Sequence, residues 1–537
     1  MMNSTKKFFG PPGTGKTTKL LNLVEKHLEE GVQPDRVAFI SYSVKAANEA
    51  KTRAQIKLGL GMDEMPYFCT SHAFCKRAMN IGRVMIGADI KDFLEKYSFT
   101  LTKNYLMTSR GSIASLQDDP YFKIIENAKI NCRTVEEERL QTPLNERDGV
   151  NPTILMAIAE AWEIFRKDTL PEIHSFADMI EVFIEKGKTP PLDVLVVDEA
   201  QDLAELNWRL VEKLARDIPT IYIAGDDDQA IYEWNGAKPE RFVSFSGESV
   251  VLDQSFRIPK KVHTLAEKIS KRIKNRQEKD YEPRDKEGLV ERVSHTDMLP
   301  IDRGQWLILA SCDYMLQDSS KGYGIRHDLI KKGIPFSHNH YRYIPLKMIA
   351  AVDVWNKLTK STESVLTMSE LADLYNYLGK TEIKRGFITK VINDPNKAQK
   401  ITRQEAIDNY GLIEECLEKE WKDVFTRTID VARRSFIEKA IANGEDLYSE
   451  PRVAISTIHQ AKGGEADNVV LASKCNFPSH FDKKNIQEKV KELRVWYTGA
   501  TRSKGTLHLL GTYHQYNFPL GKYFKLYEAN YDNKRYI

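Results

Sequence analysis

Short apolar and β-branched runs alternate with helix-like stretches over about residues 6–252, and the same pattern returns after about residue 306. Most of these runs are apolar at successive positions, and turn-forming residues bound them. Such runs are typical of strands that are buried on both faces, as in parallel sheets covered by helices. We therefore expect two α/β cores with strands at residues 6–9, 37–41, 192–197, 221–224, 250–252, 306–310, 452–457, 468–472 and 506–510.

Two longer stretches are charged, helix-like and poor in strand signals, and each lies inside one of the expected cores. We interpret them as helical insertions. The predicted domains are a first core of residues 1–75 plus 170–255, a first insertion of residues 76–169, a second core of residues 256–346 plus 451–537, and a short second insertion of residues 347–450.

Residues 260–279 form the densest basic stretch of the chain. Its apolar residues are spaced to line one face of a helix: Val262, Leu265, Ile269 and Ile273. For the lysines we favour a solvent-exposed helix surface over a contact with nucleic acid.

The composition narrows the class of protein. A length of 537 residues suggests three or four domains, and 41% hydrophobic with 29% charged residues is ordinary for a soluble globular chain. No apolar run approaches the roughly 18 residues that a membrane span requires. The six cysteines include no C-x-x-C pair, which argues against a disulfide framework or a zinc site and favours the reducing cytoplasm. With a net charge of +3, a polyanion would have to be bound in a local groove.

A phosphate-binding loop is predicted near the start of the chain. Residues 10–17 read G-P-P-G-T-G-K-T, which fits the pattern G-x-x-x-x-G-K-[ST], and they lie between an expected strand and a helix over about residues 16–30. Gly10, Gly13 and Gly15 let the backbone curl so that its N–H groups point at phosphate oxygens. The N-terminus of the helix adds a partial positive charge.

Side chains that could serve ATP and Mg²⁺ follow from the same pattern. Lys16 would reach the β- and γ-phosphates, and the Thr17 hydroxyl would bind Mg²⁺. The string D-E-A-Q-D at 198–202 follows a buried strand, where the carboxyl ends of the strands face the ligand crevice. Asp198 could then bind Mg²⁺ through water, and Glu199 could orient and deprotonate the attacking water. Two adjacent carboxylates are costly without a cation, so the pair itself favours a metal.

Six further strings identify a specific family when they are taken in order. They are S-Y-S-V-K-A-A at 41–47, T-S-H-A-F at 70–74, A-G-D-D-D-Q-A-I-Y-E-W-N-G-A at 224–237, L-D-Q-S-F-R at 252–257, S-T-I-H-Q-A-K-G-G-E at 456–465 and Y-T-G-A-T-R at 497–502. With the phosphate loop, they resemble the UvrD/Rep/PcrA-type superfamily 1 (SF1A) DNA helicases across nearly the whole chain. The resemblance implies an α/β fold with two tandem RecA-like P-loop cores, each carrying a mostly helical insertion, and an ATP site between the cores.

The resemblance also implies roles at the ATP site. Gln229 would sense the γ-phosphate, while Arg257 and Arg502 would act as arginine fingers from the second core, since a guanidinium can stabilise charge on the transferred phosphoryl group. The implied catalytic set is Lys16, Glu199, Gln229, Arg257 and Arg502. The implied nucleotide contacts are Gly10, Gly13, Thr14, Gly15, Lys16, Thr17, Thr18, Phe256 and Glu465, with Phe256 on adenine and Glu465 on the sugar. Thr18 stands where relatives often carry an arginine.

A path for single-stranded DNA is implied in the same way. Tyr42, Tyr232 and Trp234 match aromatic positions on which bases stack. The polar positions along the strand are Thr70, His72, Thr457 and His459. Core packing is the alternative for the aromatic residues, and a structural role is the alternative for the histidines. Asn235 stands where relatives usually have an arginine, which removes one possible cation–π contact with a base.

The resemblance thus implies a monomeric ATP-dependent helicase that uses Mg²⁺, binds single-stranded DNA and junctions of single and double strands, and moves 3′→5′. Replication or repair proteins are possible partners, and no membrane is involved. One alternative is a translocase that displaces proteins or acts on RNA without efficient unwinding. Another is a nucleotide-switched binding module with negligible turnover.

Overall fold

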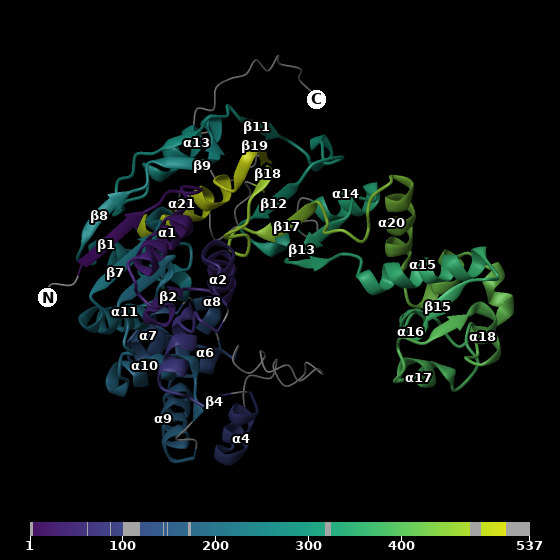
Figure 1. Ribbon diagram of the computed structural model, residues 1–537, viewed down its shortest axis with the longest axis horizontal. Helices are drawn as coiled ribbons and strands as arrows, with labels where there is room; N and C mark the ends of the chain where they lie inside the picture. Colours follow the sequence, from purple (N-terminus) through teal and green to yellow (C-terminus); the bar gives the residue numbers. More distant parts are fainter. Residues whose placement is uncertain are drawn as a thin grey trace. The chain divides into compact units, whose positions relative to one another are not determined.

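The computed structural model describes residues 4–61, 63–85, 87–99, 119–142, 144–147, 149–169, 173–316, 324–472 and 485–511. The chain divides into two compact units (Figure 1). Unit 1 comprises Met1–Glu287 and Asn485–Thr501, and unit 2 comprises Gly288–Lys484 and Arg502–Ile537. Residues 256–287, which were assigned to the second core from the sequence, group with unit 1 by their contacts. The predicted domain boundaries stay a prediction.

Six strands of unit 1 form a parallel sheet in the order β3-β2-β6-β7-β1-β8 within the described residues. Their bounds are β1 (Ser4–Phe9), β2 (Val37–Ser41), β3 (Phe68–Thr70), β6 (Val194–Asp198), β7 (Thr220–Gly225) and β8 (Glu248–Val251). Each strand predicted in this half of the chain is present, with ends that differ by a few residues. The parallel order follows from connections that each contain a helix.

Both faces of this sheet are covered by helices, as the apolar runs predicted. Phe39 of β2 packs into a core formed with α1 (Lys16–Glu29) and α2 (Val44–Leu58). Its neighbour Ile40 packs into the opposite core. The helices of that second core are α3 (Ser71–Ala78), α10 (Phe176–Lys186) and α11 (Glu205–Asp217), and the short helix α12 (Pro239–Ser244) adds Phe242. Successive strand residues point to opposite faces, so continuous apolar runs fill both cores.

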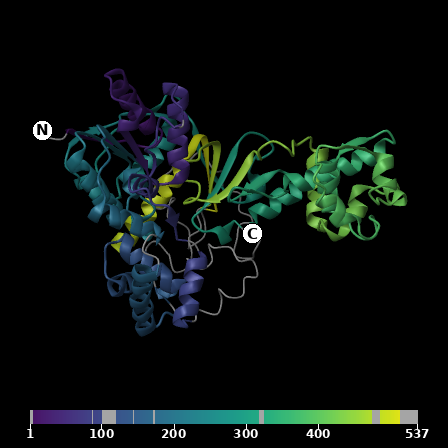
Figure 2. The ribbon, with the colours of Figure 1, turned by 60° about the horizontal axis from the view of Figure 1, so that its bottom comes forward.

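The first insertion is mostly helical, as predicted, and lies between α3 and α10 in the chain. Its elements are β4 (Arg83–Val84), α4 (Gly87–Tyr97), α6 (Pro120–Ile130), α7 (Val135–Gln141), α8 (Leu144–Arg147), α9 (Pro152–Thr169) and β5 (Ile173–His174). Helices α4, α6 and α9 share a core rich in aromatic rings, including Phe93, Phe122 and Trp162. Its helices lie beside one another in both Figure 1 and Figure 2.

Unit 1 also contains a small layer built from two distant segments. Strands β9 (Gln254–Pro259) and β10 (Glu282–Arg284) pair in parallel, and α13 (Lys260–Ser270) connects them. Helix α21 (Ile486–Ala500) packs on α13. This layer carries Phe256 and Arg257.

The structure corrects part of the prediction for the basic stretch. The predicted apolar face is buried, but α13 ends at Ser270, and Ile273 is buried in the turn beyond it. Lys260 and Lys261 are exposed, as predicted, whereas Lys279 is buried. The pattern of basic residues did not indicate that Lys279 is buried, because its partners lie in another segment of the chain.

Seven strands of unit 2 form a second sheet, as far as the chain is described, in the order β11-β19-β18-β12-β17-β13-β14, which is parallel except for the β13–β14 pair. Their bounds are β11 (Leu289–Val293), β12 (Trp306–Ala310), β13 (Phe336–His338), β14 (Tyr341–Arg342), β17 (Val453–Thr457), β18 (Ala466–Ala472) and β19 (Ser503–Leu510). Helix α14 (Ile325–Lys332) contributes to its core. The four strands predicted here are confirmed, and so is the fold class of two α/β cores.

The second insertion is also mostly helical, as predicted. Its helices are α15 (Leu346–Lys360), α16 (Met368–Tyr375), α17 (Phe387–Ile392), α18 (Arg403–Asp408), α19 (Trp421–Val424) and α20 (Val431–Ala442). A two-stranded antiparallel sheet, β15 (Val365–Thr367) with β16 (Lys400–Thr402), was not predicted. Such short strands give little periodic signal. Within the described part of the chain, no helix has the length and apolar character needed to cross a bilayer.

The aromatic core of the first insertion provides a stability test. Trp162 is fully buried and contacts Phe93 and Phe122 edge-on, with ring centroids 4.9 and 5.1 Å apart. We expect Trp162→Ala to lower the local free energy of unfolding by about 3–5 kcal/mol because it leaves a large cavity. Hydrogen exchange of the α6 and α9 amides measures this loss. Ile164→Ala on the exposed side of α9 is the matched control, and an equal effect of both changes would contradict the packing.

Candidate functional site

The loop between β1 and α1 has the geometry of an anion cradle. Gly13 and Gly15 adopt φ values of +76° and +75°, which glycine tolerates best. A Cβ atom on Gly10 would lie 2.2 Å from Cγ of Lys16, so the loop packs too closely for a side chain there. The Thr14 hydroxyl donates to the carbonyl of Pro11 at 2.8 Å and closes the turn. The loop thus curls tightly just before the N-terminus of α1, where backbone N–H groups and the helix end can bind a phosphate group.

The side chains expected to hold a metal ion meet at this loop. The Thr17 hydroxyl donates to Oδ2 of Asp198 at 2.7 Å, and Lys16 Nζ donates to the Gly10 carbonyl at 2.8 Å. Burial, together with the neighbouring Glu199 carboxylate, raises the pKa of Asp198 to about 6. A bound cation would offset both effects, and the oxygens of Thr17 and Asp198 suit Mg²⁺ held jointly with phosphate oxygens. Among the described residues, no group of three or more His, Cys, Asp or Glu is arranged to hold a metal alone.

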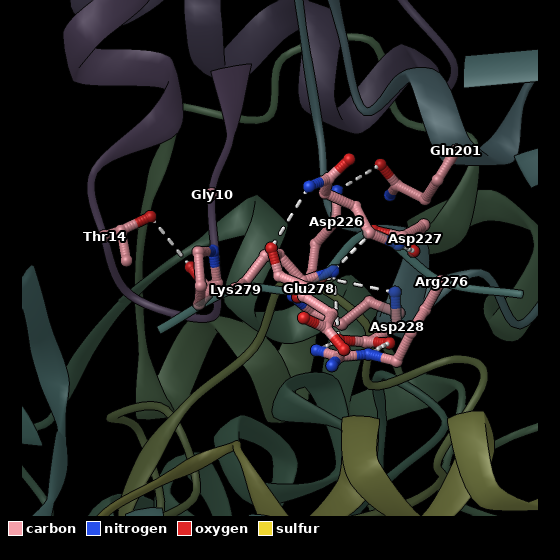
Figure 3. Close-up of polar contacts among 12 residues, drawn as sticks. Gly10, Thr14, Gln201, Asp226, Asp227, Asp228, Arg276, Glu278 and Lys279 are labelled. Carbon is pink, nitrogen blue, oxygen red and sulfur yellow. Dashed lines mark hydrogen bonds and ion pairs between the residues drawn. The ribbon is translucent and has the colours of Figure 1, made fainter. Parts of the chain in front are cut away.

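A polar network connects Glu199 with Gln229. Glu199 has a left-handed backbone with φ of 55°, directly after β6. Its Oε2 accepts a hydrogen bond from Gln201 Nε2 at 2.6 Å, and Gln201 Oε1 accepts from the backbone N–H of Asp226 at 2.9 Å. Gln229 Nε2 in turn donates to Oδ2 of Asp226 at 2.7 Å. The candidate base and the candidate phosphate sensor are therefore connected through Gln201 and Asp226. Figure 3 shows the hydrogen bond between these two linking residues.

Strand β9 lies against the phosphate loop. The Phe256 N–H donates to the Gly13 carbonyl at 2.8 Å, and the Ser255 hydroxyl donates to the Pro12 carbonyl at 2.7 Å. A Cβ atom on Gly13 would lie 2.3 Å from Cβ of Arg257. Arg257 thus lies beside the loop within unit 1, whereas the sequence prediction placed it in the second core. Phe256 is 71% exposed, so it is not part of the core.

Two of the candidate nucleotide-site residues, Arg502 and Glu465, lie in unit 2. Arg502, at the start of β19, is buried, and its Nη1 donates to the Gly464 carbonyl at 3.5 Å. The adjacent Glu465 is exposed and forms an ion pair with Lys504 at 3.6 Å. Arg502 and Glu465 are therefore neighbours in the fold of unit 2. Thr18, the remaining candidate, is an exposed residue in the first turn of α1 in unit 1.

The three aromatic candidates form one cluster. Tyr42 stacks on Tyr232, with centroids 5.5 Å apart and planes 26° apart, and Trp234 meets Tyr232 edge-on at 6.3 Å. Trp234 is 62% exposed, which does not fit the core-packing alternative for this residue. Asn235 donates from Nδ2 to the Tyr42 hydroxyl at 2.9 Å. The residue that replaces the expected arginine thus helps to hold the stacked pair.

The polar candidates have local contacts as well. Thr70 caps α3 by accepting from Ala73 N–H at 3.4 Å, and Thr457 accepts from Gln460 N–H at 3.3 Å. His72 meets Phe176 edge-on at 5.3 Å. Burial lowers the pKa of His72 to about 4, so its ring is neutral at pH 7 and would contact DNA as a polar group, not as a cation. His459 lies just beyond β17 and is partly buried.

The sequence reasoning missed Gln201 and Lys279. Gln201 stands in the D-E-A-Q-D string, and its position two residues after Glu199 is the signal that could have identified it. Lys279 contacts Asp227 across 52 residues of sequence, and no local pattern marks that contact.

Comparison with known proteins supports the resemblance that the motifs indicated. The model of the UvrD/REP helicase N-terminal domain family matches residues 3–249. The probable DNA helicase II homolog of Mycoplasma capricolum is 23% identical over 93% of this chain and 81% of its own length. The ATP-dependent DNA helicase PcrA of Bacillus subtilis is 21% identical over 93% of this chain and 79% of its own length. The Staphylococcus aureus protein of the same name is 25% identical over 50% of this chain and 37% of its own length.

The contact between Gly13 and β9 can be tested. We expect Gly13→Ala to weaken binding of a fluorescent ATP analogue by about tenfold or more, because the methyl group would displace Arg257 and strain the loop. Gly31→Ala is the matched control, since Gly31 also has a positive φ (+97°) but nothing lies within 4 Å of the added Cβ. Equal binding by the two variants would show that the loop does not form the phosphate site.

Proposed function

The chain belongs to the UvrD/PcrA-type superfamily 1 helicases, and from this premise we propose that it is an ATP-dependent motor that moves 3′→5′ along single-stranded DNA and unwinds duplex DNA. One observation carries the proposal: the buried candidate phosphate sensor Gln229 and the exposed Trp234 lie five residues apart in the short segment that follows β7. Binding or hydrolysis of ATP at Gln229 and stacking of a base on Trp234 would therefore act on the same short segment.

The residues of unit 1 have the chemistry that phosphoryl transfer needs. We propose that Lys16 and the backbone of the loop bind the phosphates, while Thr17 and Asp198 hold Mg²⁺, which when bound supplies charge neutralisation. Glu199, held by Gln201 at 2.6 Å, would orient and deprotonate the attacking water.

The remaining nucleotide roles are proposals carried by the family motifs. Gln229 would sense the γ-phosphate, and Arg257 would stabilise charge on it, consistent with the position of Arg257 beside the loop. Phe256 would stack on adenine. Arg502 is proposed as a second arginine finger and Glu465 as a sugar contact.

The aromatic cluster supports single-stranded DNA as the track. Rings offer a sequence-tolerant platform for bases, which suits a motor that must move over any sequence. We propose that Trp234 and the Tyr42–Tyr232 pair stack on bases, and that Thr70, His72, Thr457 and His459 line the strand. Direction of movement rests on the family alone. A monomer acting at junctions of single and double strands, together with replication or repair proteins, is the corresponding biological proposal.

Unwinding of tailed duplexes tests the proposed function. We expect the protein with ATP and Mg²⁺ to separate a duplex with a 3′ single-stranded tail, and to leave blunt and 5′-tailed duplexes largely intact. Lys16→Ala is the inactive control because it removes the phosphate-binding ammonium. ATP turnover that rises with single-stranded DNA but without strand separation would indicate a translocase instead. Turnover that does not respond to single-stranded DNA or RNA would contradict any motor.

Trp234 provides a test of the DNA platform. A base–aromatic stack contributes about 1–3 kcal/mol, so Trp234→Ala should raise the DNA concentration for half-maximal ATPase by about fivefold or more. Basal turnover should change little. Trp234→Phe, which keeps a ring, is the matched control and should stay closer to the wild type. If Trp234→Ala lowers basal and stimulated turnover equally, the ring has a packing role.

A further inference from the structure

Three consecutive aspartates, Asp226, Asp227 and Asp228, follow β7 and are buried. The Lys279 side chain, which is only 1% exposed, contacts all three (Figure 3). Its Nζ lies 2.9 Å from Oδ1 of Asp226 and 3.0 Å from Oδ2 of Asp228, and it also donates to Asp227. Although burial would lower the pKa of Lys279, the three carboxylates more than reverse this effect and raise it. Lys279 is therefore charged, and its ammonium group forms an ion pair with each aspartate of this turn.

The other two aspartates have additional partners from the same segment. Arg276 forms a two-pronged pair with Asp228, at 2.7 Å from Nε and 2.5 Å from Nη2. The backbone N–H of Gln277 donates to Oδ2 of Asp227 at 2.8 Å. The segment after α13 thus supplies partners to every aspartate of the turn. Three carboxylates face two cations, which leaves one net negative charge in the cluster.

Asp226 differs from its neighbours because it also reaches the candidate catalytic groups. One carboxylate oxygen contacts Lys279, and the other accepts the hydrogen bond from Gln229 Nε2 at 2.7 Å. Its backbone N–H donates to Gln201, which holds Glu199. A carboxylate fixed at one oxygen presents the other oxygen in a defined direction, and so orients the amide of Gln229.

We propose that Lys279 is a positioning residue for ATP hydrolysis, which acts through Asp226 to fix the side-chain amide of Gln229. This inference rests on the proposed function, because it assigns Gln229 to the γ-phosphate. Lys279 touches neither nucleotide nor metal in this scheme. Its effect would fall on the rate of hydrolysis and much less on the affinity for ATP, since the phosphate loop is not among its contacts.

A purely structural role of Lys279 must be separated from this positioning role. Lys279→Met alone leaves three buried carboxylates with one cation, which is strongly destabilising. The double variant Lys279→Met with Asp227→Asn leaves two carboxylates with one cation and restores the wild-type net charge of the cluster. Asp227 is the suitable partner because its carboxylate oxygens accept from Lys279 and from the Gln277 N–H, whereas the side-chain amide of Gln229 donates to Asp226.

The experiment compares the wild type, Lys279→Met and the double variant in the full chain. Thermal unfolding reports stability, titration with a fluorescent ATP analogue reports binding, and single-turnover hydrolysis with saturating single-stranded DNA reports the chemical step. We expect the double variant to regain most of the stability lost in Lys279→Met and to bind ATP like the wild type. Its hydrolysis should stay about 10- to 100-fold below the wild type, the size of loss that misplacing a catalytic group produces.

The control is Lys271→Met. This variant removes a lysine just beyond α13 whose side chain is 66% exposed and pairs with Glu267. It should leave hydrolysis unchanged. Wild-type hydrolysis in the stable double variant would overturn the positioning role.

If the double variant does not fold, Asp226→Asn tests the same contact. An amide has one acceptor oxygen where the carboxylate has two, so either Lys279 or Gln229 must lose its partner. Unchanged hydrolysis in Asp226→Asn would then overturn the proposal. A wild type without DNA-stimulated ATPase would instead refute the proposed function.

Discussion

The parallel pairing of β6, β7 and β1 is the constraint on which the candidate site depends. These strands are neighbours in the sheet, so their carboxyl ends lie at one edge. The phosphate loop follows β1, Asp198 and Glu199 lie at the end of β6, and the turn with Gln229 follows β7. Residues separated by as many as 181 positions, such as Thr17 and Asp198, are thereby brought within hydrogen-bond distance. The apolar runs that bury both faces of the sheet are what keep this edge in register.

Much of this arrangement could be predicted because its signals are local. Apolar runs indicated the strands, and the glycine pattern indicated a loop whose Gly13 and Gly15 indeed take positive φ values. The contact between Thr17 and Asp198 then follows from the rule that carboxyl ends of parallel strands share an edge. The grouping of Tyr42 with Tyr232 and Trp234 came from the family resemblance, and the observed ring contacts agree with it.

What could not be predicted depends on tertiary contacts between distant segments. Lys279 belongs to a basic stretch that looks like an exposed helix face, and only the path of the chain after Ser270 brings it to the aspartates. Asn235 reaches the Tyr42 hydroxyl across 193 positions, so the sequence showed the loss of an arginine but not the gain of this bond. Strand β9 likewise contacts the phosphate loop of unit 1 through the Phe256 N–H and the Ser255 hydroxyl, and no periodicity encodes these contacts.

The left-handed backbone of Glu199 has a consequence for how this protein balances durability against chemistry. A non-glycine residue in that conformation costs on the order of 1 kcal/mol, and glycine would adopt it without strain. The end of β6 would therefore be less strained with glycine at position 199, but glycine lacks the carboxylate that the proposed mechanism uses. At position 199 folding stability therefore favours glycine, whereas the proposed hydrolysis requires glutamate. No single substitution at this position would increase both stability and turnover.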